Sequence, residues 1–577
     1  MKQSRRISLL LLLVMSLASA RGVRFDYASV PASENHSQSQ YSIDNDEVNG
    51  LQNFFRVTLA ATEKHFRGQL GEVNAFGAGT TYPQIWLRDS ATAIPVTRYY
   101  YPLDFMTSWI EEHLSHQNRD GGLNDWIASG GRSNFLAGAP RVREVYRDAS
   151  SLAGGSIAAD KNTTEADQET SAVDAVYQVF RIKGDSKWLT KKVAGQPIVR
   201  RLDRSLSYLL NARFDGRHGL ITNALTADWG DVSSVYDDQR AIYLDRRTPR
   251  AASLYTNVLF YRATKQMSDM YRALGQTHRS IYWLKRGERV KRNINKFMWQ
   301  ENKGFYRMHV QLTPGPREPF DESNLFAMGG NGLAVLYAVA DNRQAARIFD
   351  VASQRQHEFG FSTIAGVLLP PYPRGFFRHP AVNEEYKYQN GGQWDWFAGR
   401  FLLAEFEFGD SRRATEQLMA IAAKAKASGG LYEWHTREGM GMGSPNYLGS
   451  AGALAAALFQ GLFGVYLTAD SLEVRIRLAE RSARINLHEP ATNRTVFYEY
   501  KYSPAEARLV LTYESNFPKL GNICVRMPND AQPQRFLRDG KQMQFRTETV
   551  GNDRYGCFKT DWARHQVEAY VVNARPD

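Results

Sequence analysis

Residues 391–427 read GGQWDWFAGRFLLAEFEFGDSRRATEQLMAIAAKAKA, and this stretch shows the unit that repeats along the chain. Apolar side chains recur every three to four residues over 391–408 and again over 410–427, which is the spacing of an amphipathic helix. Gly409-Asp410-Ser411 interrupts the pattern, since glycine often follows the end of a helix and aspartate or serine often precedes its start. The stretch therefore predicts two helices joined by a short turn.

Helical spacing of this kind recurs over most of the chain. We expect twelve helices, near residues 48–66, 88–100, 103–118, 168–183, 197–212, 250–274, 277–299, 322–339, 341–357, 391–408, 410–427 and 447–464. Short connections such as Gly184-Asp185-Ser186 alternate with long ones, which lie near 67–86, 119–166, 213–249, 300–320 and 358–390. Six such hairpins predict a ring, the (α/α)6 toroid, in which the long connections wall a pocket on one face.

The spacing changes after about residue 466. Short runs such as Leu472–Leu478 and Leu509–Tyr513 alternate apolar and polar residues with a period of two, and turn residues separate them. This pattern predicts an antiparallel β domain. The expected fold class is thus mainly α, with an (α/α)6 toroid over 48–465 followed by a smaller C-terminal antiparallel β domain over 466–577.

The first twenty residues have the layout of a secretory signal peptide. A basic start precedes an apolar run over 7–17 and the small residues Ala18-Ser19-Ala20. A membrane anchor is the alternative, but a bilayer span needs about 20 apolar residues. We expect a signal peptide over 1–20, a polar arm over 21–47, and a secreted or periplasmic protein that does not associate with membranes.

The 577-residue chain has a formal net charge of +12, and three of its basic residues belong to the predicted leader. Basic surfaces attract nucleic acids, anionic membranes or acidic glycans, but the Lys and Arg residues here are scattered, so we expect no nucleic-acid partner. The chain also holds 11 Trp, 29 Tyr and 30 Phe. Sugar rings stack on aromatic planes, so this content suits a carbohydrate substrate. The oligomeric state stays open.

Cys524 and Cys557 are the only cysteines of the sequence. No histidines accompany them at the spacing of zinc ligands, so we expect neither a metal nor another cofactor. In an oxidising compartment the two cysteines would form a disulfide that closes a loop of 34 residues and adds about 3–4 kcal/mol of stability. Sequons for N-glycosylation begin at Asn35, Asn162 and Asn493.

Hydrolysis of a glycosidic bond needs one carboxylic acid to protonate the leaving oxygen and a second carboxylate to activate water or attack carbon. The first candidate loop is Thr226–Val232, where Trp229 lies between Asp228 and Asp231. The tryptophan offers a stacking plane, and burial beside it would raise the pKa of the Asp231 carboxyl group. The alternative is a helix cap or an Asx-turn, which are common positions of aspartate.

The second candidate is Glu433, which lies between Tyr432 and Trp434. A flexible loop rich in glycine and methionine follows over 439–444. The aromatic flanks strengthen the case for a catalytic role, and the alternative is a solvated surface glutamate.

Further motifs carry residues suited to sugar binding. Trp86-Leu87-Arg88-Asp89-Ser90 can hold hydroxyl groups through charge-assisted hydrogen bonds, and Gly391-Gly392 precedes two tryptophans. Gly121–Trp126 and Asp167-Gln168-Glu169-Thr170 are weaker candidates. A helix terminus, a cap or a tight turn is the alternative for each motif. The candidate sugar contacts are Trp86, Arg88, Asp89, Asp125, Trp126, Glu169, Asp228, Trp229, Gln393, Trp394 and Asp395.

The motifs and their order resemble those of known toroid enzymes. Asp228-Trp229-Gly230-Asp231 is similar to the Asp-Trp-Asn-Asp loop of the cellobiose-phosphorylase group, in which the last Asp is the general acid. Asn390–Trp394, Tyr432-Glu433 and Tyr447–Gly452 follow in the order of that group. Trp86–Ser90 resembles the Trp-Leu-Arg-Asp-Ser motif of exo-α-mannosidases, and in those hydrolases and their trehalase-like relatives a late Glu is the base.

This resemblance covers about residues 80 to 470 and implies a six-hairpin toroid glycosidase, with Asp231 as general acid and Glu433 as general base. Two departures separate the chain from the phosphorylases. It lacks their large N-terminal β-sandwich, and Gly230 stands where they have Asn. The resemblance therefore implies a superfamily, a fold and an acid, but no substrate.

We accordingly expect a secreted glycosidase that hydrolyses O-glycosyl bonds in oligo- or polysaccharides. Long loops that close the pocket favour exo-action, and the expected mechanism is inverting. Three alternatives stay open. A phosphorylase would use phosphate in place of water. A polysaccharide lyase can be built on the same toroid, but lyases act through Tyr, His, Asn or Arg. A glycan-binding protein would bind without turnover.

Overall fold

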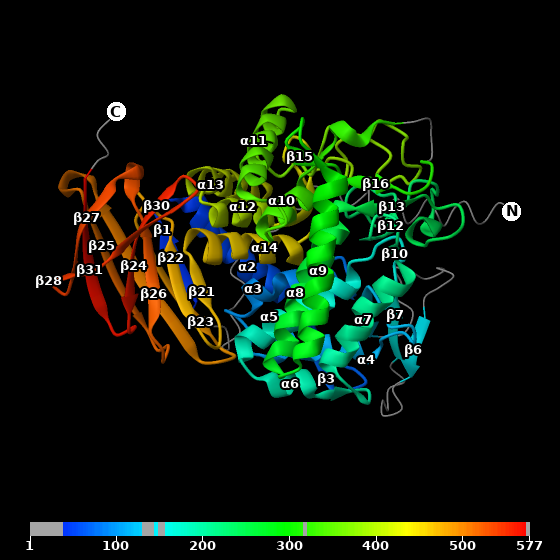
Figure 1. The fold of residues 1–577 in the computed structure, drawn as a ribbon, viewed down its shortest axis with the longest axis horizontal. Coiled ribbons are helices and arrows are strands. Elements are labelled where there is room, and N and C mark those ends of the chain that lie inside the picture. Colours follow the sequence, from blue (N-terminus) through cyan, green and yellow to red (C-terminus); the bar gives the residue numbers. More distant parts are fainter. Residues whose placement is uncertain (1–38, 130–142, 148–155, 316–319, 573–577) are drawn as a thin grey trace.

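The computed structural model describes residues 39–129, 143–147, 156–315 and 320–572, and it has a helical part and a β-rich part side by side (Figure 1). The predicted signal peptide, the sequon at Asn35 and most of the polar arm lie outside the described residues. Within those residues, no helix combines the length and the apolar composition that a membrane crossing requires.

Six inner helices form a closed ring, because each contacts the next and the last, α14, contacts the first, α3. The inner helices are α3 (Leu87–Thr97), α5 (Gln168–Lys183), α8 (Leu254–Ala273), α10 (Met328–Leu336), α12 (Asp395–Phe408) and α14 (Leu448–Ala456). The outer helices are α2 (Asp46–Thr62), α4 (Asp104–Ser115), α7 (Ile198–Ala212), α9 (Thr277–Met298), α11 (Asn342–Glu358) and α13 (Ser411–Ser428). The ring is the expected (α/α)6 toroid, and a short helix, α6 (Ser186–Thr190), lies between α5 and α7.

Small residues allow the inner helices to approach closely. A Cβ at Gly452 of α14 would collide with the backbone of Thr92 in α3, and a Cβ at Gly399 of α12 would collide with the backbone of Ala453 in α14. In the hairpin of α12 and α13, Gly409 ends the first helix with a left-handed φ of 91°. That conformation costs glycine little and other residues more, which explains the turn predicted from the sequence.

The C-terminal part consists of two β-sheets. One has the strand order β1-β23-β24-β25-β31-β27-β28 and the other β21-β22-β26-β30-β29. The strands are β1 (Gln40–Ile43), β21 (Val465–Leu467), β22 (Leu472–Ile476), β23 (Ala483–Glu489), β24 (Arg494–Ser503), β25 (Arg508–Ser515), β26 (Gly521–Arg526), β27 (Gln532–Arg538), β28 (Lys541–Met543), β29 (Arg546–Val550), β30 (Asp553–Thr560) and β31 (His565–Val572). The expectation of purely antiparallel pairing is wrong at one place, since β22 and β26 run parallel.

The connections of the toroid contain short strands that the sequence pattern did not reveal. Helices make up 40% and strands 26%, so the mainly α class is confirmed only in part. The short strands are β2 (Glu63–Arg67), β3 (Glu72–Phe76), β4 (Ile85–Trp86), β5 (Trp126–Ser129), β6 (Arg143–Arg147), β7 (Ser156–Asp160), β8 (Lys192–Val193), β9 (Gln196–Pro197), β10 (Phe214–Asp215), β11 (Leu220–Ile221), β12 (Asn223–Ala224), β13 (Arg250–Ser253), β14 (Trp299–Gln300), β15 (Phe305–Tyr306), β16 (His309–Gln311), β17 (Phe326–Ala327), β18 (Leu368–Leu369), β19 (Tyr432–His435) and β20 (Gly441–Pro445).

Two links tie the β-rich part together and to the toroid. Cys524 of β26 lies opposite Cys557 of β30, and the pair forms the expected disulfide with Cα atoms 4.0 Å apart, slightly closer than the usual range. Arg98, which follows α3, forms a buried ion pair with Glu489 of β23. The toroid and the sheets therefore share a packed interface.

Candidate active site

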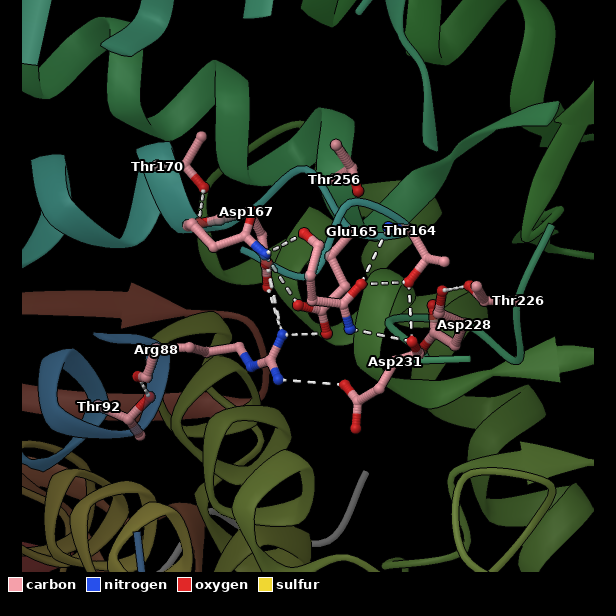
Figure 2. A network of polar contacts seen from close by, with 12 residues as sticks. Arg88, Thr92, Thr164, Glu165, Asp167, Thr170, Thr226, Asp228, Asp231 and Thr256 are labelled. Carbon is pink, nitrogen blue, oxygen red and sulfur yellow. Dashed lines mark hydrogen bonds and ion pairs between the residues drawn. The ribbon is translucent and has the colours of Figure 1, made fainter. Parts of the chain in front are cut away.

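Arg88, near the N-terminal end of α3, is the centre of a buried polar network (Figure 2). Its Nη1 lies 2.6 Å from Glu165 and 3.2 Å from Asp167, and its Nη2 lies 3.2 Å from Asp231. Burial alone would lower the pKa of the guanidinium, but these carboxyl groups raise it well above its usual value. Arg88 therefore stays charged and holds carboxyl groups in place of the expected sugar hydroxyls.

Asp231 is fixed through both its backbone and its side chain. Its carbonyl oxygen accepts hydrogen bonds from Asn162 Nδ2 at 2.9 Å and Thr164 Oγ1 at 2.8 Å. Its Oδ2 accepts a hydrogen bond from the hydroxyl of Tyr388 at 3.2 Å. The side chain is 27% exposed, the most open of the three carboxylates that contact Arg88. Asp231 can thus reach a substrate that the other two cannot.

The titration of Asp231 differs from the expectation. Desolvation raises its pKa, but the hydrogen bond with Glu165 and the charge of Arg88 lower it by more. The pKa of Asp231 is therefore below its usual value. The indole of Trp229 is 4% exposed and packs against Phe397 with ring centroids 4.0 Å apart.

Glu433 lies in β19 and accepts three kinds of hydrogen bond. The hydroxyl of Tyr82 is 3.0 Å from both carboxylate oxygens, the hydroxyl of Tyr388 is 3.3 Å from Oε1, and the backbone N–H of Ser444 donates to Oε2 at 3.0 Å. Burial raises the pKa of Glu433 to about 7, against the effect of the Ser444 and Tyr82 hydrogen bonds. The group therefore titrates near neutral pH.

The hydroxyl of Tyr388 bridges the two candidate carboxylates. It is 3.2 Å from Asp231 Oδ2 and 3.3 Å from Glu433 Oε1, so these two oxygens can be at most about 6.5 Å apart. Carboxyl groups of inverting glycosidases are roughly 6.5–9.5 Å apart and those of retaining ones about 5–5.5 Å. Residues about 200 positions apart in the sequence are thus brought within about 6.5 Å of each other, an upper bound that includes the retaining range and the lower end of the inverting range.

Other expected sugar contacts lie near this pair. Trp86 is partly exposed, and its ring is 6.1 Å from that of Tyr82 and 6.4 Å from that of Trp126, which is buried. Asp89 is buried and hydrogen-bonded to Tyr447, and burial raises its pKa. Burial also raises the pKa of Asp125 to about 8.

The remaining expected contacts are buried. Asp395 is fully buried, with its Oδ1 2.5 Å from Lys424 Nζ. Glu169 is fully buried and bonded to Lys161 and the Leu123 N–H. The others, buried as well, are Asp228, Trp229, Gln393 and Trp394.

Sequence reasoning missed Glu165, Tyr82 and Tyr388 as site residues. Glu165 precedes α5, where an acidic residue usually signals a cap, and the tyrosines lie in long connections. The sequon at Asn162 cannot carry a glycan in this fold, because the side-chain amide is buried and donates to the carbonyl oxygen of Asp231. The sequon at Asn493 is exposed.

Two other features of the described residues are not paired-carboxylate sites. A cavity of about 770 Å³ opens in the β-rich part, lined by residues that include Arg538, Lys541 and Lys559. The one group of possible metal ligands found in the described part of the chain is Cys524, Glu548 and Cys557, whose cysteines are joined in the disulfide. The network around Arg88 is therefore the candidate active site.

Comparison with known proteins gives a family match over part of the chain. The sequence model of the Trehalase family matches residues 232–367, a segment that begins directly after Asp231 and ends before Glu433. No curated protein matches the chain significantly in sequence.

Three solved structures share the fold. The α-L-rhamnosidase from Dictyoglumus thermophilum has a TM-score of 0.57 at 11% identity and matches 92% of this chain and 50% of its own. The GH78 rhamnosidase of Bacillus sp. GL1 has a TM-score of 0.55 at 13% sequence identity, and the match covers 83% of this chain and 41% of the rhamnosidase. The α-L-rhamnosidase from Aspergillus terreus has a TM-score of 0.53 at 10% sequence identity, and the match covers 92% of this chain and 50% of the rhamnosidase. The chain thus spans half or less of these rhamnosidases.

The partial match to the Trehalase family and the toroid shared with the rhamnosidases both make the chain similar to six-hairpin glycosidases. The expected resemblance is confirmed at this level. Within the class, the sequence match points to the trehalase-like enzymes, over 232–367.

Proposed function

We propose that the protein is a secreted, exo-acting, inverting glycoside hydrolase, with Asp231 as general acid and Glu433 as general base. The observation that carries the proposal is the convergence of both carboxylates on the hydroxyl of Tyr388. Exo-action is supported by the origin of the site residues, since Tyr82, Asp231 and Tyr388 all come from long connections. The leader-like first twenty residues and the disulfide support secretion.

In this mechanism Asp231 gives a proton to the glycosidic oxygen as the bond to the anomeric carbon breaks. Glu433 removes a proton from a water molecule whose hydroxyl adds to that carbon from the opposite face. The hydrogen bonds from Tyr82, Tyr388 and Ser444 stabilise the ionised form of Glu433 that this step needs.

A second assignment exchanges the two roles. Of the two carboxyl groups, Glu433 has the raised pKa and Asp231 the lowered one, which is the order expected if Glu433 were the acid. We favour Asp231 as the acid because a second carboxyl group, Glu165, is hydrogen-bonded to it and can supply the proton.

The test is incubation of the purified protein with a panel of oligosaccharides and aryl glycosides, with products followed by proton NMR. We expect a free monosaccharide whose first-formed anomer is the inverse of the substrate's. A retained anomer would contradict inversion, a sugar phosphate formed only with phosphate would indicate a phosphorylase, and an unsaturated product would indicate a lyase. Binding without turnover would contradict the enzyme assignment.

A further inference from the structure

Four carboxyl groups crowd around the single guanidinium group of Arg88. One positive charge cannot balance four buried negative charges, so at least one of the four carboxyl groups holds a proton. Lys161, a second cation of this region, is bonded to Glu169 at 2.7 Å. The four groups belong to Asp125, Glu165, Asp167 and Asp231.

Glu165 is placed to hold this proton beside Asp231. Its side chain is 2% exposed; Arg88 Nη1 is 2.6 Å from Oε1, and Gln168 Nε2 donates to Oε2 at 3.0 Å. Burial raises the pKa of Glu165 well above its usual value, despite the charge of Arg88. The raised pKa thus favours the protonated form of Glu165, next to the group that has to deliver a proton.

The chain fixes Glu165 relative to Asp231. Asn162 and Thr164, just before Glu165, both donate to the carbonyl oxygen of Asp231. Figure 2 shows the carboxyl groups of Glu165 and Asp231 beside each other, at Nη1 and Nη2 of Arg88. A proton can therefore pass between the two carboxyl groups without a backbone rearrangement.

We propose that Glu165 is a positioning residue that stores the proton which Asp231 delivers to the glycosidic oxygen. This inference rests on the proposed role of Asp231. In the resting site the proton is on Glu165 and Asp231 is ionised beside Arg88. The proton moves to Asp231 and then to the leaving oxygen as the glycosidic bond breaks, which leaves both carboxyl groups ionised. Solvent returns one proton to the pair before the next turnover.

Other charged groups face this pair and are unchanged in Glu165→Gln and Glu165→Asp. They are Arg88, Asp125 and Asp167 around Glu165, and Asp89, Glu433, Tyr82, Tyr388 and His379 around Asp231. A shift that follows a change at Glu165 alone is therefore assigned to Glu165.

The decisive variant is Glu165→Gln, which keeps the shape and an N–H donor toward Asp231 but carries no proton to give. Asp231 must then take its proton from solvent while its pKa is lowered by Arg88. We expect the basic limb of the kcat/KM profile to move down by at least about one pH unit, which is about tenfold in rate above that limb. An aryl glycoside with a dinitrophenolate leaving group needs no acid, so its turnover should change less than about twofold.

The matched control is Asp167→Asn, which also contacts Arg88 Nη1. It removes one of the charges that raise the pKa of Glu165 but leaves the proton of Glu165 in place, so it should move the basic limb by clearly less than Glu165→Gln. Glu165→Asp, which keeps a titratable carboxyl group, should restore part of the alkaline activity, and it serves as second variant if Glu165→Gln does not fold.

Equal losses on both substrates with an unmoved basic limb would overturn the proposal and leave Glu165 a structural residue. Failure of the proposed function is a separate outcome, because Asp231→Asn would then retain turnover on the substrate with the poor leaving group.

Discussion

Glu433 accepts hydrogen bonds from Tyr82, Tyr388 and the backbone of Ser444 in a buried position. Burial raises its pKa to about 7. A base has to be ionised to act, so activity should be lost as the pH falls through about 7. We expect an acidic limb near that pH in the kcat/KM profile of the unaltered enzyme, and a limb near pH 4.5 would contradict this assignment.

Tyr82→Phe tests the role of Glu433 by removing a hydroxyl group that donates to its carboxylate. The hydroxyl of Tyr82 lowers the pKa of Glu433, so its loss should move the acidic limb to higher pH. Below pH 7, kcat/KM should then fall by about tenfold for each pH unit that the limb moves. Tyr466→Phe is the control, since that hydroxyl donates to Glu407 outside the site. Coincident profiles for Tyr82→Phe and the unaltered enzyme would exclude the role of Tyr82.

At this scale the aromatic and glycine-rich flanks of Asp231 and Glu433 made both residues candidates, and the structure brings both to the hydroxyl of Tyr388. It could not locate Glu165, whose position before a helix resembles an ordinary cap. It also gave no sign of the partner of Asp395, because the contact with Lys424 cannot be inferred from neighbours in the sequence.

At the scale of elements, α12 and α13 are joined by a buried ion pair. Asp395 at the start of α12 is bonded to Lys424 of α13, and His435 of β19 packs beside it with Nδ1 3.8 Å from Asp395. This support lies behind the strand that carries Glu433.

Lys424→Met should therefore leave a buried carboxylate without its partner and lower the free energy of unfolding by about 3–5 kcal/mol. Lys426→Met, on the same helix, removes an exposed partner of Glu47. It should change the free energy of unfolding by less than about 1 kcal/mol. Denaturant unfolding followed by circular dichroism measures both. Equal effects of the two substitutions would show that burial does not decide the cost.

The helices were predictable because each is long enough to display several turns of apolar spacing. The ends of the helices were harder to predict, since α12 begins at Asp395 and not at residue 391. The backbone of Gln393 pairs with that of His435, a contact that no local pattern announces. Strands of two to five residues, such as β4 and β19, are too short for a period-two pattern to stand out.

At the scale of the whole molecule, the β-rich part carries the disulfide and the toroid carries the active site. Cys524→Ser combined with Cys557→Ser removes a cross-link that closes a loop of 34 residues. We expect a loss of about 3 kcal/mol in stability and an unchanged kcat at a temperature where the variant stays folded. A large fall in kcat of the folded variant would mean that the β-rich part shapes the site.

The change from helical spacing to period-two spacing near residue 466 was enough to anticipate this two-part architecture. The parallel pair of β22 and β26 was not, because strand direction depends on how the chain crosses between sheets.

The assignment of Asp231 and Glu433 as acid and base of a glycoside hydrolase can be tested with one set of kinetics. The measurement is kcat/KM of Asp231→Asn and Glu433→Gln on two glycosides of one sugar, with an alkoxide and a dinitrophenolate leaving group. We expect Asp231→Asn to lose several orders of magnitude on the alkyl glycoside and little on the activated one, whereas Glu433→Gln should lose activity on both. The reverse pattern would exchange the two roles, and near-normal turnover of either variant on the alkyl glycoside would contradict the assignment.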